Sequence, residues 1–333
     1  MIFVHLENIE SFGYFLKKGI DEDFSYNVTP VALRVKGFSK FLYKLLSSKK
    51  VFKLFPFLPR RWLCRYLIDK KTLSKIKNQN NVCFVIHGYT DLTFLYNQYL
   101  QSAFPTSKRI IVFEDKIEHY CDNYRSFDIK KVQDSFDCAL TYNSFDSKEY
   151  EMPLYPPIVP DFSSFEDSYH FKQIDVFFIG RDKGRLSTII DLYDSLRENG
   201  LICEFHLIGI PKRKRVFRDS IIYHNKPLPY AFTLAKNKST KAILNVMQDG
   251  ATGVTLRDFE AISLNKVLIT NCKDIKDYDF YSSEKVVFTD SIHFLNNDAL
   301  LEKEKLTWNN VGLYNISNYY RVIKKELQNK KLD

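Results

Sequence analysis

Several features that commonly reveal a protein's class are missing from this sequence. Its six cysteines (64, 83, 121, 138, 203 and 272) include no C-x-x-C pair, which argues against a zinc ribbon, a redox motif and a disulfide scaffold. No apolar run approaches the roughly 18 residues that a membrane-spanning helix needs. The start MIFVHLENIE has no cationic segment followed by an apolar one, so no secretory signal is expected. These absences favour a soluble or peripheral protein of the reducing cytoplasm.

Acidic residues are too few to balance the basic ones. The 333 residues include 49 Lys and Arg against 40 Asp and Glu, a net charge of +9. This excess favours an anionic partner, such as a phosphate ligand, a nucleic acid or a membrane surface. The hydrophobic share of 45% and the charged share of 27% are close to globular averages, which excludes a disordered chain. The length is comfortable for two domains.

The basic excess is concentrated in residues 31–80, where Asp69 is the only acid. The apolar spacing there predicts two short helices with aromatic residues on one face and cations on the other. Such helices are typical of contact with an anionic membrane surface, although their apolar faces could instead pack on the protein's own core. The residues assigned to the membrane-facing side are Lys36, Lys40, Lys44, Arg60, Arg61 and Trp62. No nucleic-acid partner is expected, because no zinc finger, RNA-binding strand signature or recognition helix accompanies the charge.

Apolar runs alternate with helical patterns along most of the chain. Strands are predicted at 82–86, 109–113, 136–141, 175–179, 203–208, 221–224, 241–247 and 266–270, and helices at 186–199, 255–264 and 308–328. This order is typical of parallel α/β sheets. The stretch MPLYPPIVPD at 152–161 holds four prolines and is interpreted as a linker. We therefore expect Rossmann-like domains over 1–151 and 162–305, and a terminal helix within 306–333.

A cationic turn lies between the predicted strand 175–179 and the helix that follows. It contains Gly180, Arg181, Lys183, Gly184 and Arg185. Three cations so close together repel one another, but at a helix N-terminus they can hold a diphosphate together with free backbone N–H groups. The alternative is a solvated charged turn. The carboxyl end of a parallel strand, where open α/β sheets bind their ligands, favours binding.

A second glycine-containing turn follows the strand at 241–247. Thr255 and Asp258 fit a capping box that fixes the start of the next helix. Arg257 and Glu260 share one face near that start, as a cation for phosphate and a carboxylate for sugar hydroxyls would, although a surface salt bridge is the alternative. The candidate donor-binding residues of this turn are Gly250, Thr252, Gly253, Thr255, Arg257 and Glu260.

The two turns together resemble the donor half of a known family. DVFFIG followed by RDKGR, and later QDGATGVTLRDFEAISLNKVLITN, are similar to signatures of bacterial GT-B glycosyltransferases that build capsule, O-antigen and lipopolysaccharide core. The resemblance covers about residues 174–275. It implies an α/β GT-B fold with two Rossmann-like domains facing across a cleft and a terminal helix crossing back between them. It also implies a nucleotide-sugar donor, UDP-linked as first expectation, on the C-terminal domain and an acceptor, often lipid-linked, on the N-terminal one.

One candidate site residue matches the family's pattern, and another departs from it. Glu260 falls where such enzymes place the carboxylate that binds ribose. Thr252 stands where many retaining members have a further Glu, so the stereochemical outcome does not carry over.

An inverting transfer needs a base near the acceptor hydroxyl. Glu114 and Asp115, at the end of one predicted strand, are the first candidates, and His87, at the end of another, is the second. Strand-end polar residues also commonly cap helices or bond loop backbone. Asp277 and Asp279 have the spacing of a metal-binding pair but follow the last clear strand, and are interpreted as structural.

Neither a metal nor a cofactor is therefore expected. The diphosphate would be neutralised by helix dipoles and by Arg181, Lys183, Arg185 and Arg257.

These observations predict a peripheral, metal-independent glycosyltransferase on the inner face of the cytoplasmic membrane. It would move a sugar from a nucleotide diphosphate donor to a lipid-linked or oligosaccharide acceptor in surface polysaccharide synthesis. Two alternatives remain open. One is a non-catalytic or nucleic-acid-binding protein that uses the basic N-terminal half, and the other is a transferase of glycerol or ribitol phosphate.

Overall fold

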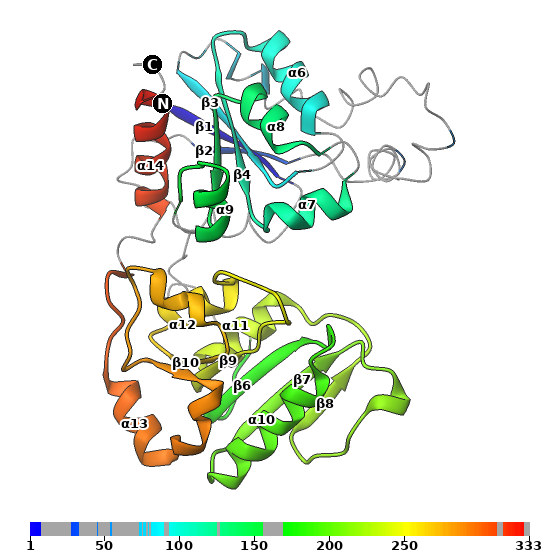
Figure 1. The fold of residues 1–333 in the computed structure, drawn as a ribbon, viewed down its shortest axis with the longest axis vertical. Coiled ribbons are helices and arrows are strands. Elements are labelled where there is room, and N and C mark those ends of the chain that lie inside the picture. Colours follow the sequence, from blue (N-terminus) through cyan, green and yellow to red (C-terminus); the bar gives the residue numbers. More distant parts are fainter. Residues whose placement is uncertain are drawn as a thin grey trace. The chain divides into compact units, whose positions relative to one another are not determined.

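A computed structural model of the chain (Figure 1) describes residues 1–7, 28–32, 45, 54, 73–74, 76–77, 79, 81–89, 93–124, 127–155, 169–311 and 316–329. The chain divides into two compact units, one of Met1–Pro157 with Ile316–Asp333 and one of Ile158–Asn315. The boundary between them falls inside the proline-rich stretch. Within the described ranges, no helix is long and apolar enough to cross a membrane. The six residues predicted to face a membrane lie outside these ranges.

The first unit is built on a five-stranded sheet in the order β2-β1-β3-β4-β5, and every strand pair in it is parallel. Its elements are β1 (Ile2–Glu7), β2 (Val28–Ala32), β3 (Val82–His87), α6 (Thr93–Ala103), β4 (Lys108–Phe113), α7 (Ile117–Asn123), α8 (Ile129–Ser135), β5 (Cys138–Thr141), α9 (Ser144–Glu149) and α14 (Ile316–Asn329). The three strands predicted in this half are confirmed as β3, β4 and β5. They are apolar almost throughout because a parallel sheet is covered on both faces.

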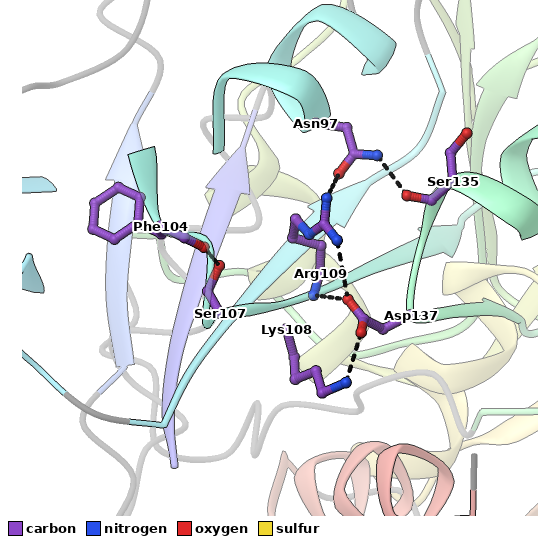
Figure 2. Close-up of polar contacts among 7 residues, drawn as sticks. All are labelled: Asn97, Phe104, Ser107, Lys108, Arg109, Ser135 and Asp137. Atoms are coloured by element: carbon purple, nitrogen blue, oxygen red, sulfur yellow. Dashed lines mark hydrogen bonds and ion pairs between the residues drawn. The ribbon is translucent and has the colours of Figure 1, made fainter. Parts of the chain in front are cut away.

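A polar network fixes the amino ends of β4 and β5 (Figure 2). Asp137, just before β5, accepts hydrogen bonds from Lys108 Nζ at 2.7 Å and from the backbone N–H of Arg109 at 2.9 Å. The Arg109 guanidinium also donates to Asn97 Oδ1 at 3.4 Å, and the Asn97 amide donates to the Ser135 carbonyl at 2.7 Å. These cations therefore hold the sheet together, at the end opposite to the strand-end candidates His87 and Glu114.

Helix α14 packs on the first unit beside β1 (Figure 1). The ring of Tyr320 stacks on Phe3 with centroids 4.4 Å apart, and Tyr319 meets Tyr155 edge-on at 5.7 Å. The helix begins at Ile316, so the prediction of a helix from Trp308 was wrong at its start. Trp308 instead packs on Phe280 in the second unit, because its indole N–H finds a partner there, the Lys266 carbonyl at 2.9 Å.

The second unit holds a six-stranded parallel sheet in the order β11-β10-β9-β6-β7-β8. Its elements are β6 (Ile174–Arg181), α10 (Leu186–Glu198), β7 (Cys203–Ile208), η2 (Lys212–Lys214), β8 (Ile221–His224), α11 (Tyr230–Lys238), β9 (Thr240–Asn245), α12 (Leu256–Ser263), β10 (Val267–Thr270), η3 (Lys273–Asp277), β11 (Val286–Phe288), η4 (Thr289–Phe294) and α13 (Asn297–Lys305). All predicted strands and both predicted helices of this half are confirmed. Counted from β6, this is the doubly wound order 3-2-1-4-5-6.

Alternating side chains bury both faces of this sheet. On one face, Phe205 and Leu207 of β7 pack with Ile189 and Leu196 of α10, and on the other Ile243 of β9 packs with the Phe259 side of α12. The chain passes from β6 outward to β7 and β8 and then returns to build β9 beside β6 (Figure 1). The strand order therefore reverses between β6 and β9. At such a switch point, doubly wound sheets bind ligands beyond the carboxyl ends of the strands.

Candidate functional site

The first loop at the switch point is a tight turn between β6 and α10. The backbone N–H of Arg185 donates to the Asp182 carbonyl at 3.0 Å, and the Asp182 carboxylate accepts from the N–H of Leu186 at 3.0 Å. The two central residues, Lys183 and Gly184, have φ of +46° and +83°. Glycine adopts this left-handed conformation freely, whereas lysine pays roughly 1 kcal/mol for it. A strained lysine at a strand end is typical of a functional site.

The second loop runs from β9 to α12 and contains two left-handed glycines. Gly250 and Gly253 have φ of +74° and +75°, and the N–H of Gly253 donates to Asp274 at 2.8 Å. The predicted cap is confirmed: Thr255 is the N-cap of α12, and its N–H donates to the buried Asp258 carboxylate at 2.6 Å. The loop is thereby fixed at its carboxyl side, where Arg257 lies in the first turn of the helix.

The structure brings the two loops together through an arginine pair, Arg185 and Arg257. The Arg257 guanidinium lies over the Phe178 ring, 5.7 Å from its centroid. A Cβ added at Gly180 would lie 2.8 Å from the same ring and 3.5 Å from Arg185 Nη2, so glycine at 180 leaves room for both groups. Burial and the nearby charge of Arg257 lower the pKa of Arg185.

The arginine pair forms no ion pair with a carboxylate in the described parts of the chain, although the charges of Asp182 and Glu260 lie near enough to act on it. Arg185 Nε and Arg257 Nη1 are buried without a hydrogen-bond partner, and neither guanidinium forms an ion pair with a described carboxylate. Two unpaired cations in one partly buried site are unfavourable unless a ligand supplies the negative charge. The exposed Arg181 and Lys183 add two further positive charges on the same loop.

The Glu260 carboxylate, unlike one on the protein surface, is almost fully buried. It is 2% exposed, and its two oxygens accept hydrogen bonds from the Tyr230 hydroxyl at 2.7 Å and the Asn237 amide at 2.8 Å. Burial raises its pKa, and the charge of Arg257 opposes that rise. Both partners come from α11, which the sequence patterns did not predict. No signal in the sequence marked them as neighbours of Glu260.

In the first unit, two of the three candidate bases form a pair. His87 Nδ1 lies 2.9 Å from Glu114 Oε1, and their side chains are 4% and 27% exposed. This joins the carboxyl ends of β3 and β4, which are neighbours in the sheet. Asp115 lies outside the pair: its side chain is 63% exposed and 4.0 Å from His119. A histidine oriented by a carboxylate is a common arrangement for a general base.

The aspartates of the D-x-D motif take part in local structure. Asp277 ends the short helix η3, and the Asp279 carbonyl accepts a hydrogen bond from the Asn310 amide at 2.9 Å. Among the described residues, no group of three or more His, Cys, Asp or Glu side chains could hold a metal ion.

The chain folds into two units, each built on a parallel α/β sheet, and solved structures share this fold. No protein-family model and no curated protein matches the sequence. The trehalose-6-phosphate synthase OtsA matches with a TM-score of 0.60 at 8% identity, covering 98% of this chain and 99% of that one. A UDP-forming α,α-trehalose-phosphate synthase from Burkholderia xenovorans, in complex with glucose-6-phosphate, matches with a TM-score of 0.56 at 9% identity, covering 98% and 99%.

A third structure, from E. coli and bound with UDP-2-fluoro glucose, matches with a TM-score of 0.53 at 9% identity, covering 99% of this chain and 96% of that one. Likeness at such low identity shows the fold. The predicted α/β GT-B fold is thereby confirmed.

Proposed function

We propose that this protein is a glycosyltransferase that takes its sugar from a nucleoside diphosphate donor, with UDP as the first expected nucleotide. The arginine pair carries the proposal, because two cations from separate loops share one site and neither forms an ion pair with a described carboxylate. The neighbours support it, since one is a UDP-forming synthase and another is bound with UDP-2-fluoro glucose.

The donor's diphosphate would form the ion pairs that the two arginines do not form with any described carboxylate. It would lie against the two guanidinium groups, with the exposed Arg181 and Lys183 beside it on the β6–α10 turn. The amino ends of α10 and α12 add backbone N–H groups and the positive ends of two helix dipoles. As the bond to the sugar breaks, charge grows on the departing diphosphate. Fixed cations stabilise the transition state, in which this charge has grown, more than they stabilise the ground state, and this difference lowers the barrier.

Glu260 would bind the ribose of the same donor. Each of its oxygens accepts one hydrogen bond from α11, and a carboxylate oxygen can accept a second. The Tyr230 and Asn237 contacts then hold the carboxylate in a fixed orientation for the sugar hydroxyls.

The first unit would bind and activate the acceptor. The His87 and Glu114 pair is suited to take a proton from an acceptor hydroxyl, because the carboxylate orients the ring and stabilises its charged form. Residues 31–80, with their excess of cations, support an acceptor held at an anionic membrane. A lipid-linked or oligosaccharide acceptor of bacterial surface polysaccharide synthesis fits this surface and the family resemblance.

Lys183→Asn tests the donor site with little change to the fold, because asparagine tolerates the left-handed conformation and removes only the charge. We expect affinity for UDP to fall by about fivefold or more, as measured by calorimetry with UDP, GDP, CDP and their sugar conjugates. Lys172→Asn is the matched control, because Lys172 is exposed and precedes the amino end of the same strand.

Unchanged UDP affinity in Lys183→Asn would contradict the role of this loop. If a CDP-linked polyol bound more tightly than any nucleotide sugar, the assigned function would change from sugar transfer to polyol phosphate transfer. Binding of RNA with no response to any nucleotide would remove the enzymatic function altogether.

A further inference from the structure

A second cationic surface lies on the second unit, in the loop between β7 and β8. Residues 211–219, here called the cationic loop, read PKRKRVFRD, with five cations between Lys212 and Arg218 and one acid, Asp219. At its centre Phe217 is 86% exposed and Val216 is 37% exposed. A phenylalanine so exposed between cations gains none of the stabilisation that burial of its apolar surface normally provides.

The cationic loop is held in place rather than left loose. The Tyr223 hydroxyl of β8 accepts a hydrogen bond from the Val216 N–H at 2.9 Å and donates to the Val216 carbonyl at 2.8 Å. Arg215 Nε donates to the Ile210 carbonyl at 3.0 Å, and its guanidinium lies 5.1 Å from the centroid of the Tyr223 ring. Arg218 adds two bonds of 2.7 Å to Asp194 of α10. Because these contacts fix both flanks, the projection of Phe217 is built into the loop.

The remaining cations of the loop face solvent. Lys212, Arg213 and Lys214 form the short helix η2 and are exposed. None of them forms an ion pair with a carboxylate in the part of the chain that the structure describes. The structure therefore separates two cations used to brace the loop, Arg215 and Arg218, from three that are available to a partner.

We infer that the cationic loop docks on an anionic lipid bilayer, with Phe217 and Val216 entering the headgroup boundary and η2 lying against the charged surface. Each cation near such a surface strengthens binding by about fivefold, so three give roughly a hundredfold. Burial of the Phe217 ring adds roughly tenfold or more. A membrane fits better than a nucleic acid, because Val216 has no face for base stacking and one convex ring offers no platform for successive bases.

The cationic loop is a different segment of the sequence from residues 31–80, and the inference rests on the proposed function only in expecting an acceptor at a membrane. Full-length protein would be co-sedimented with vesicles of phosphatidylcholine alone and of phosphatidylcholine with phosphatidylglycerol. We expect the wild type to bind only the anionic vesicles. Phe217→Ser should weaken that binding about tenfold, and a triple change of Lys212, Arg213 and Lys214 to Gln about a hundredfold. Phe294→Ser, at another exposed phenylalanine of the same unit (75% exposed), should bind as the wild type does.

Calorimetry with UDP separates this inference from the proposed function. Both loop variants should keep the wild-type affinity for UDP, which also shows that they are folded. Vesicle binding that is absent in the wild type, or unchanged in both variants, overturns the inference whatever UDP does. If the loop variants lose binding to a short RNA while their binding to vesicles is unchanged, the inference is overturned and a nucleic acid is the partner. A protein that binds vesicles through the loop and ignores every nucleotide keeps the inference and removes the proposed function.

Discussion

Replacing Arg185 with methionine should make the ligand-free protein more stable while weakening its response to UDP. Arg185 is held in a site where burial and the charge of Arg257 both disfavour its cation, and its Nε is buried without a partner. Methionine keeps most of the apolar stem, which packs in the same place. The substitution therefore removes a charge that lowers the stability of the ligand-free protein and that serves ligand binding.

The magnitude follows from the contacts that are lost. A buried, unsatisfied polar group costs about 1–3 kcal/mol, and the substitution removes that cost and the repulsion with it. Against this stands one long hydrogen bond, 3.4 Å from Arg185 Nη2 to the Arg181 carbonyl, worth about 0.5 kcal/mol. We expect a net gain of about 1 kcal/mol, which raises the midpoint of a domain of this size by about 2–4 °C.

Calorimetry with and without UDP would measure both effects. At a hundredfold excess over its dissociation constant, UDP should stabilise the wild type by about 2.7 kcal/mol. Arg185→Met should weaken UDP binding by about tenfold or more, since a charge-assisted hydrogen bond is lost. Arg197→Met is the control, because Arg197 lies in the last turn of the same helix and donates to the Leu201 carbonyl at 2.9 Å.

The Arg197 variant should lose stability and keep the UDP response. A lower midpoint for ligand-free Arg185→Met, or an unchanged UDP response, would refute the reasoning.

Three further predictions concern other groups. Hydrogen bonding to His206 and Lys236, together with the charge of Lys236, lowers the pKa of Glu204 from 4.5 to about 2. The stability that this carboxylate contributes is present above pH 4.5 and is lost as the pH falls through about 2. Urea unfolding of Glu204→Gln should lack this pH dependence. His87→Asn should lower kcat by about a hundredfold or more and leave the UDP affinity unchanged, whereas equal kcat values would leave His87 a structural role. Burial lowers the pKa of Lys285 from 10.5 to about 8, so stability should rise between pH 8 and 10.5, and Lys285→Met should remove that rise.

The sequence was most informative where one local rule was sufficient. Buried parallel strands are nearly continuous apolar runs, so β3, β6 and β10 could be located from composition alone. The capping box of Thr255 and Asp258 fixed the start of α12, because both residues lie within one helical turn. The adjacency of the β6–α10 and β9–α12 loops followed from the general rule for ligand sites in doubly wound sheets.

Long-range contacts explain what the sequence patterns missed. The helical spacing of apolar residues continues through Trp308, but the choice between two cores depended on Phe280 and on the Lys266 carbonyl, both distant in sequence. The burial of Glu260 likewise depends on Tyr230 and Asn237. Nothing in a local window distinguishes a carboxylate that faces solvent from one that two residues of another helix enclose.

The doubly wound order has a consequence for how this unit can change. Between Arg181 and Thr240 the chain leaves the centre of the sheet, builds two outer strands and comes back to the strand next to its starting point. Insertions or charge reversals in that detour, including those in the cationic loop, leave the hydrogen bonds between β6 and β9 untouched. The cationic loop lies in the sequence between Arg185 and Arg257, the two members of the arginine pair. Substitutions in that loop can therefore change membrane attachment without changing how the pair binds an anion.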